Sequence, residues 1–367
     1  MKSLSSIFSF DTLKGFPAPT AAMLLAMALV LALRLALAPL SGALQAMPPP
    51  HPLSDQLRFL ENPSRKTPRA VFFGSSRIQA GLDPELFAGL AGFDPETVWN
   101  LASESGTPWE ALALCRKAPV LVSGPGLVVI GVEPWMFNQN EPGRWGLQFD
   151  RLATLREKWR VKNLRDRARL VSRHLLGLPE KRPLDTWLTV LGNLAAPPYL
   201  QAMPRPLYHQ DPALAARVAL DPKYQPRSIV RPHMENFVLS PVKAGYLTNL
   251  LDLLRTPGRT LVLFMPPARK EYLEAISQDP VMAAGLAEFR KFVQGLAKGG
   301  VRLVFWETAG DCGLDESIFL DYGHLSRDGG QRLTEALSRE MESWEDPGTV
   351  RPSRRTGTPA FRRGPGG

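Results

Sequence analysis

Residue types that together perform acyl transfer occur at two distant places in this chain. Ser76 follows the apolar run 70–73 and a glycine, so it stands where a short buried strand ends. Asp321 and His324 are three residues apart, which allows a carboxylate to contact an imidazole. A serine nucleophile needs a base, and the base needs a third group that fixes its tautomer. The sequence therefore predicts a Ser76–His324–Asp321 triad; the alternative for each segment alone is an ordinary loop.

The elements around these residues alternate between strands and helices. Apolar runs predict five strands, at residues 70–73, 97–101, 127–132, 260–264 and 301–306. Helices are expected at residues 84–90, 108–117, 241–254, 271–276, 282–298 and 328–342. This alternation predicts an α/β fold with a five-stranded parallel sheet and helices on both faces. Ligands of such sheets bind outside the carboxyl ends of the strands, where Ser76 is expected.

Three blocks of the sequence resemble those of the SGNH (GDSL-type) hydrolases. They are the Gly-Ser-Ser-Arg of residues 74–77, residues 100–106 and the Asp-Tyr-Gly-His of residues 321–324. The closer likeness is to membrane-anchored bacterial members, including proteins of alginate O-acetylation and teichoic acid D-alanylation, and it covers residues 68–137 and 236–343. The resemblance implies a flavodoxin-like three-layer fold with strand order 2-1-3-4-5.

The resemblance also implies roles for individual residues. Ser76 matches the nucleophile, His324 the base and Asp321 the acid. The backbone N–H groups of Ser76 and Gly106 match the donors that bind the oxyanion. Arg77 stays charged near neutral pH and cannot shuttle protons, so we expect it to support the turn or hold an anionic substrate group.

One block departs from the family pattern. The family carries an asparagine after the third strand as a side-chain oxyanion donor, and this chain has Glu133 in that place. A carboxylate repels an oxyanion, and the loss of one donor costs roughly 10²–10³-fold in rate. Asn138 is a nearby residue that could donate instead. The departure weakens the prediction of fast hydrolysis but not that of the fold.

The N-terminal part predicts attachment to a membrane. Residues 20–38 are nearly unbroken apolar chain, long enough to cross a bilayer once, between a cytoplasmic segment 1–19 and a proline-rich linker 39–67. The competing interpretation is a signal peptide cleaved near residues 41–43. In both cases the bulk of the chain leaves the cytoplasm. We expect a single-pass protein of the bacterial cytoplasmic membrane with an extracytoplasmic domain.

The expected SGNH-like domain, residues 68–343, is interrupted by a helical insertion at about residues 138–235. Within the insertion, residues 151–176 form a basic helical pattern, either a solvated face or a surface for anionic lipid or glycan. Residues 195–232 are rich in proline and are expected to be mainly loop. The basic tail, residues 344–367, is expected to be disordered.

Composition narrows the possible partners. The net charge of +9 suits an anionic partner such as lipid headgroups or an acidic glycan, and no nucleic-acid motif accompanies it. The two cysteines and five histidines form no metal-ligand pattern, so we expect neither metal nor cofactor. Cys115 and Cys312 could form a disulfide outside the cytoplasm, although Cys115 is better explained as a small buried residue.

These features predict serine-dependent ester chemistry outside the cytoplasm. The resemblance implies transfer or removal of an O-acyl group on a cell-surface or exported polysaccharide, with a membrane-bound O-acyltransferase as partner. The alternative is a non-catalytic accessory protein that keeps the fold and binds glycan or the acyltransferase, which Glu133 favours. A third possibility, motivated by the basic helical pattern, is a lipid-facing esterase.

Overall fold

The structure is a computed structural model that describes residues 54–140, 200–202, 205–298 and 300–344, with isolated positions at 20, 29, 155, 159 and 171. The chain divides into two compact units. Residues 1–61 and 145–200 form one unit, to which the described helix α2 (Ser54–Leu60) belongs. Residues 62–144 and 201–367 form the other unit, which holds every predicted site residue.

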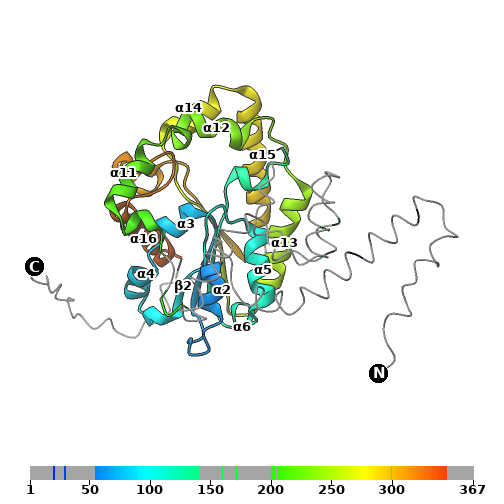
Figure 1. The fold of residues 1–367 in the computed structure, drawn as a ribbon, viewed down its shortest axis with the longest axis vertical. Coiled ribbons are helices and arrows are strands. Elements are labelled where there is room, and N and C mark those ends of the chain that lie inside the picture. The colour runs from blue at the N-terminus through cyan, green and yellow to red at the C-terminus, as the bar shows by residue number, and fades with distance from the viewer. Residues whose placement is uncertain are drawn as a thin grey trace, which may run out of the picture. The chain divides into compact units, whose positions relative to one another are not determined.

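Five parallel strands form a single sheet in the order β2-β1-β3-β4-β5 (Figure 1). Their bounds are Ala70–Phe73 (β1), Val98–Asn100 (β2), Leu127–Gly131 (β3), Thr260–Met265 (β4) and Val301–Phe305 (β5). Every residue of β1 and β3 is buried, as expected for central strands of a sheet that is covered on both faces. The predicted parallel sheet and its strand order are confirmed, and the architecture is consistent with a flavodoxin-like fold.

Helices cover both faces of this sheet (Figure 1). On one face, Phe72 of β1 packs with Ile78, Phe87 and Leu333 in one apolar cluster. These residues lie on α3 (Ser76–Gly81), α4 (Pro84–Ala91) and α16 (Arg327–Glu342). The other face is covered by α5 (Pro108–Lys117), α13 (Pro241–Leu254) and α15 (Pro280–Leu296). Ser76 therefore begins a helix that is fixed by the core beneath it.

Short helices fill the connections. They are η3 (Pro95–Thr97), α6 (Val120–Ser123), η4 (Pro134–Phe137), α14 (Lys270–Ser277), η7 (Ala309–Cys312) and η8 (Glu316–Ile318). The described end of the insertion forms η5 (Leu207–His209), α11 (Pro212–Leu220), η6 (Pro222–Tyr224) and α12 (Pro226–Met234). The expectation of mainly loop is wrong here, because prolines occupy the first helical turns and Asp211 and Asp221 cap them.

Several predictions about the rest of the chain fall outside the described residues. They concern the anchor 20–38, the basic pattern 151–176 and the tail after residue 344. Only two isolated positions of the anchor and three of the basic pattern are described. Part of the predicted linker 39–67 is the helix α2. In the described part of the chain, no helix is long and apolar enough to span a bilayer.

The disulfide considered for Cys115 and Cys312 is absent, and both are free thiols. Cys115 is buried on α5, whereas Cys312 packs against the cluster on the α3–α16 face. The sheet separates the two side chains, so they cannot approach each other. Burial raises the pKa of the Cys115 thiol to about 12, which suits an inert core residue.

A buried carboxyl group closes the N-terminus of α5, directly after the loop of residues 100–106. Glu110 accepts a hydrogen bond from the backbone N–H of Thr107 at 2.8 Å and another from its hydroxyl. Together they form a capping box. Burial raises the pKa of Glu110 to about 7, although the bonds from Thr107 oppose the shift.

This pKa predicts a pH-dependent contribution to stability. Between the ordinary pKa near 4.5 and the folded value near 7, the folded state binds more protons at Glu110 than the unfolded state. The free energy of unfolding should therefore fall as pH rises through this window, by at most about 1.4 kcal/mol per pH unit. Glu110→Gln keeps the cap and removes the titration, so urea unfolding from pH 4.5 to 7 should show a flatter profile for the variant. Parallel profiles would contradict the prediction.

Candidate active site

The nucleophile position is set by the turn between β1 and α3. Gly74 has φ +148°, and a Cβ there would lie 2.5 Å from Ile78 Cγ1, so only glycine fits. Ser75 follows as the N-cap of α3, and its Oγ accepts a hydrogen bond from the Arg77 N–H at 3.1 Å. The Ser75 hydroxyl donates to Glu133. Ser76 is therefore the first residue of α3, with a half-buried side chain.

The structure brings the three predicted triad residues together. Ser76 Oγ lies 2.8 Å from His324 Nε2, and His324 Nδ1 lies 2.7 Å from Asp321 Oδ2. The carboxylate can only accept, so Nδ1 carries the proton and Nε2 is left to accept the proton of Ser76. Asp321 is buried and also accepts hydrogen bonds from the backbone N–H groups of Gly323 (3.0 Å) and His324 (2.8 Å). These bonds fix the loop and the tautomer together.

Three tyrosine rings pack edge-on against the imidazole. The ring centroids of Tyr208, Tyr224 and Tyr322 lie 6.0, 5.9 and 5.7 Å from that of His324. The backbone N–H of Tyr322 also donates to the Tyr224 carbonyl at 3.2 Å. Tyr208 and Tyr224 belong to the predicted insertion, and no spacing in the sequence links them to His324. Sequence reasoning missed both.

Arg77 is buried and connects the turn to the segments after β3 and β4 and to the histidine loop. Its NH1 donates to Glu133 Oε2 at 2.7 Å, and its NH2 donates to the carbonyls of Pro266 (2.7 Å) and Pro267 (2.6 Å). Its Nε lies 3.4 Å from the carbonyl of Gly323, and a Cβ on Gly323 would lie 2.5 Å from that Nε. The Arg77 guanidinium thus donates to acceptors of the protein itself. Arg77 therefore supports the turn and the histidine loop.

Glu133 is a fully buried carboxylate whose oxygens both have partners. Arg77, the Ser75 hydroxyl and Trp135 Nε1 (3.0 Å) all donate to it. Burial raises the pKa of Glu133, but the charge of Arg77 and these hydrogen bonds outweigh burial and hold the pKa below its ordinary value. The expectation that Glu133 simply repels an oxyanion needs correction, because Arg77 neutralises its charge.

The expectation that Asn138 supplies a substitute oxyanion donor is wrong. Its side-chain amide donates to the carbonyls of His233 (3.1 Å) and Glu235 (3.5 Å), and its oxygen accepts from the N–H groups of Asn140 and Val238. The side chain is buried and joins the segment after β3 to the segment before α13. Asn138 is a structural link between chain segments.

The loop of residues 100–106 lies directly against the nucleophile turn. A Cβ on Gly106 would lie 2.3 Å from the Gly74 carbonyl oxygen, so this approach requires glycine. The Gly106 N–H donates to the Ser103 carbonyl at 2.9 Å, and its role as an oxyanion donor stays a prediction. Asn100 holds the end of α3, because its side-chain amide donates to the carbonyls of Ile78 (3.1 Å) and Leu82 (2.7 Å).

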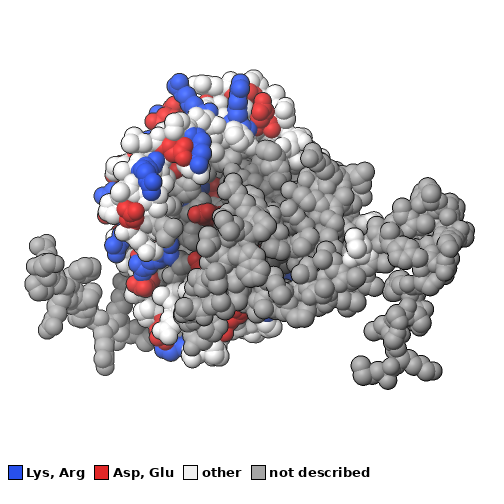
Figure 2. Space-filling model, viewed as in Figure 1, with Lys and Arg blue, Asp and Glu red and all other residues white. Residues whose placement is uncertain are grey.

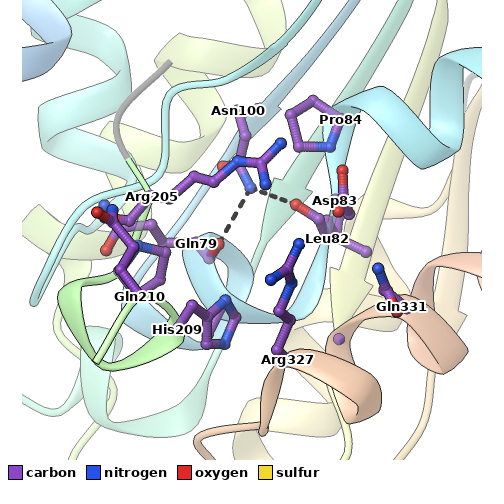
Figure 3. A pocket seen from close by; sticks show the side chains of 13 residues that line it. Gln79, Leu82, Asp83, Pro84, Asn100, Arg205, His209, Gln210, Arg327 and Gln331 are labelled. Atoms are coloured by element: carbon purple, nitrogen blue, oxygen red, sulfur yellow. Dashed lines mark hydrogen bonds between the residues drawn. The ribbon is translucent and has the colours of Figure 1, made fainter. Parts of the chain in front are cut away.

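A cavity of about 150 Å³ lies beside α3 and the start of α16 (Figure 3). Its lining includes Gln79, Asp83, Arg205, His209, Arg327 and Gln331. Ser76 and His324 do not line it, and Arg205 forms an ion pair with Glu85 at 2.7 Å. The described residues that line the cavity include no serine, threonine or cysteine.

Among the described residues, no group of three or more His, Cys, Asp or Glu side chains is placed to hold a metal. His233 instead stacks on Trp135 and its Nδ1 lies 3.2 Å from the Tyr272 hydroxyl oxygen. The Nε2 of His209 lies 3.1 Å from the Leu325 carbonyl oxygen. Both histidines therefore have structural contacts.

Comparison of the sequence with protein-family models finds no match, and a search of curated proteins finds none.

The Arg77 network predicts a matched pair of variants. Arg77→Lys keeps the charge but loses the fork, so at least one buried acceptor loses its charged donor. The free energy of unfolding should fall by at least about 1.5–3 kcal/mol, measured by denaturant unfolding. Arg69→Lys, at an exposed site just before β1, should change it by less than about 0.5 kcal/mol. Equal effects at the two sites would show that the buried fork does not matter.

Proposed function

We propose that the protein performs serine-dependent ester chemistry, either O-acyl transfer or O-acyl ester hydrolysis. The observation that carries this proposal is the continuous hydrogen-bond chain from Ser76 through His324 to Asp321. It lies at the carboxyl end of the interior strand β1, and open parallel sheets bind their ligands outside such strand ends. Buried partners hold each member, so the geometry is in place before a substrate binds.

The reaction begins with attack of Ser76 Oγ on an acyl carbonyl, while His324 Nε2 takes the hydroxyl proton. Asp321 stabilises the imidazolium that forms. Ser76 is the first residue of α3, so its own N–H has no acceptor within the helix and is available for the oxyanion. The family resemblance assigns the second backbone donor to Gly106, whose N–H donates to the Ser103 carbonyl in this structure, so that bond has to be exchanged for one to the oxyanion. His324 then returns the proton to the leaving alcohol, and water or a sugar hydroxyl attacks the acyl-enzyme.

The proposal extends to the substrate and its location. The sequence blocks resemble those of the membrane-anchored bacterial branch of the SGNH hydrolases, and the sheet order agrees with that likeness. The acyl group would then be carried by a cell-surface or exported polysaccharide, with a membrane-bound O-acyltransferase as the donor partner. On the face in Figure 2, acidic and basic side chains are interspersed over the described residues, so no large basic patch there supports an acidic glycan.

The second candidate is a non-catalytic accessory protein that binds glycan or the acyltransferase. Two observations favour it: Glu133 stands where the family has a donor, and the Gly106 N–H is hydrogen-bonded to Ser103. A fluorophosphonate probe separates the two candidates, since only an activated serine reacts with it. Labelling at Ser76 supports the enzyme, and an unreactive Ser76 supports the accessory protein.

The triad predicts strongly non-additive variants. Ser76→Ala and His324→Ala should each abolish nearly all hydrolysis of p-nitrophenyl acetate, and the double variant should be hardly slower, because the residues act as a unit. Asp321→Asn should lose much of the rate because the tautomer is no longer fixed. Far-ultraviolet circular dichroism should match wild type for all of them. The control is Ser123→Ala, which alters an exposed serine of α6 and should leave the rate unchanged.

Additive losses in the double variant would contradict a single catalytic unit. Full activity of Ser76→Ala would show that the nucleophile lies elsewhere.

The membrane topology predicts the result of a protease experiment. If residues 20–38 span the membrane with the N-terminus inside, protease added to intact spheroplasts should digest residues 47–367. Full protection of the domain, with digestion only after lysis, would contradict this orientation.

A further inference from the structure

Tyr208 brings to the triad a buried polar group that has no role in the proposed mechanism. Its ring meets the His324 ring edge-on, at 6.0 Å between centroids and 67° between planes. Its hydroxyl is buried and has no hydrogen-bond partner in the part of the chain that the structure describes. A buried donor left unpaired costs about 1–3 kcal/mol, so its presence needs a reason.

The ring of Tyr208 lies against the histidine loop, at His324. Burial raises the pKa of Tyr208 above its ordinary value, and the negative charges of Asp321 and Glu104 add to the shift. Asp321 lies in the histidine loop, and Glu104 lies in the loop of residues 100–106 that packs on Gly74. The phenol therefore stays protonated near neutral pH, and it acts as a neutral donor.

The short helix η5 is anchored, which fixes the tyrosine. Burial lowers the pKa of His209, so its ring is neutral, and its Nε2 lies 3.1 Å from the Leu325 carbonyl oxygen. Since that carbonyl can only accept, Nε2 is the donor. Leu325 directly follows the catalytic histidine, so η5 and His324 are tied together. Figure 3 shows His209 at the neighbouring cavity.

Among the described residues, neither of the two side chains considered for the oxyanion-donor position, Glu133 and Asn138, supplies a free donor. Both oxygens of Glu133 accept hydrogen bonds, and the amide of Asn138 is directed at backbone carbonyls. A neutral phenol is chemically suited to this task, because it can donate to developing negative charge without a proton transfer.

We propose that Tyr208 is a further catalytic residue, whose hydroxyl donates a hydrogen bond to the substrate carbonyl oxygen as that oxygen becomes an oxyanion. The inference rests on the proposed ester chemistry. As the bond from Ser76 Oγ to the acyl carbon forms, the carbonyl π pair moves to the oxygen, which accepts from Tyr208. When the pair returns, the bond to the alcohol oxygen breaks, and His324 protonates the alcohol. Tyr208 keeps its proton throughout.

Tyr224 provides a matched control. Its ring also meets His324 edge-on, at 5.9 Å and 88°, and it comes from the same segment of chain. Unlike that of Tyr208, its hydroxyl is not among the buried, unpartnered polar atoms of the described residues, and Lys223 Nζ lies 4.6 Å from the centroid of its ring. Phenylalanine at either position keeps the ring that packs on the imidazole and removes a single oxygen.

The test measures hydrolysis of p-nitrophenyl acetate and the rate of fluorophosphonate labelling, with full-length wild type, Tyr208→Phe and Tyr224→Phe. Tyr208→Phe should lower kcat by roughly 10²–10³-fold, with KM changed by less than about threefold, because the lost bond forms only in the transition state. Labelling should slow similarly, since the phosphoryl oxygen occupies the same place. Tm should not fall, because a buried unpaired hydroxyl has been removed. Tyr224→Phe should keep wild-type kcat.

The outcomes distinguish this inference from the proposed function. If wild type is labelled at Ser76 and Tyr208→Phe reacts equally fast, the inference about Tyr208 is overturned and the ester chemistry stands. An equal loss in both phenylalanine variants overturns it too, because the effect would come from packing. If wild type is not labelled at all, the proposed function fails and the role of Tyr208 fails with it.

Discussion

The buried ion pair between Arg77 and Glu133 is the constraint on which the site depends. Moving a charge out of water is costly unless it is paired and fully hydrogen-bonded, so every acceptor around the guanidinium must be in place. Those acceptors come from the end of β3, the segment after β4 and the histidine loop. Arg77 itself directly follows the nucleophile. A single side chain therefore sets the positions of Ser76 and His324 relative to each other.

Ser75 and Ser76 have different hydrogen-bond partners because their backbone conformations differ. Ser75 is extended, with φ −82° and ψ −174°, and its hydroxyl turns inward to Glu133, whereas Ser76 is already helical and turns to His324. The inward serine thus connects the nucleophile turn to the buried carboxylate. This explains how a carboxylate can stand beside the turn that holds Ser76: both of its oxygens accept hydrogen bonds and its charge is balanced by Arg77.

The sheet and the triad were predictable because their signals are local. Buried parallel strands read as continuous apolar runs, and Asp321 and His324 are near neighbours in sequence. The Arg77–Glu133 pair was not predictable, because it joins two strand ends that are 56 residues apart. From the sequence alone, Glu133 was expected only to repel an oxyanion. Asn138 failed for a similar reason: its partners lie about 95 residues away. The prolines of the insertion were interpreted as loop residues, whereas they stand in the first turns of helices. The contact between Tyr208 and His324 was not predictable either, because it depends on tertiary packing alone.

The close contact between Arg77 and Gly323 limits how this active site can change over time. A Cβ on Gly323 would collide with the guanidinium, so the residue before the base is fixed by a side chain 246 positions away and not by the chemistry of the base. If Arg77 were first replaced by a smaller residue, a side chain at position 323 would no longer collide with it. If Gly323 were replaced first, the new side chain would displace Arg77 and leave the Glu133 carboxylate without its charged partner. The contact therefore restricts the order in which the two residues can be replaced.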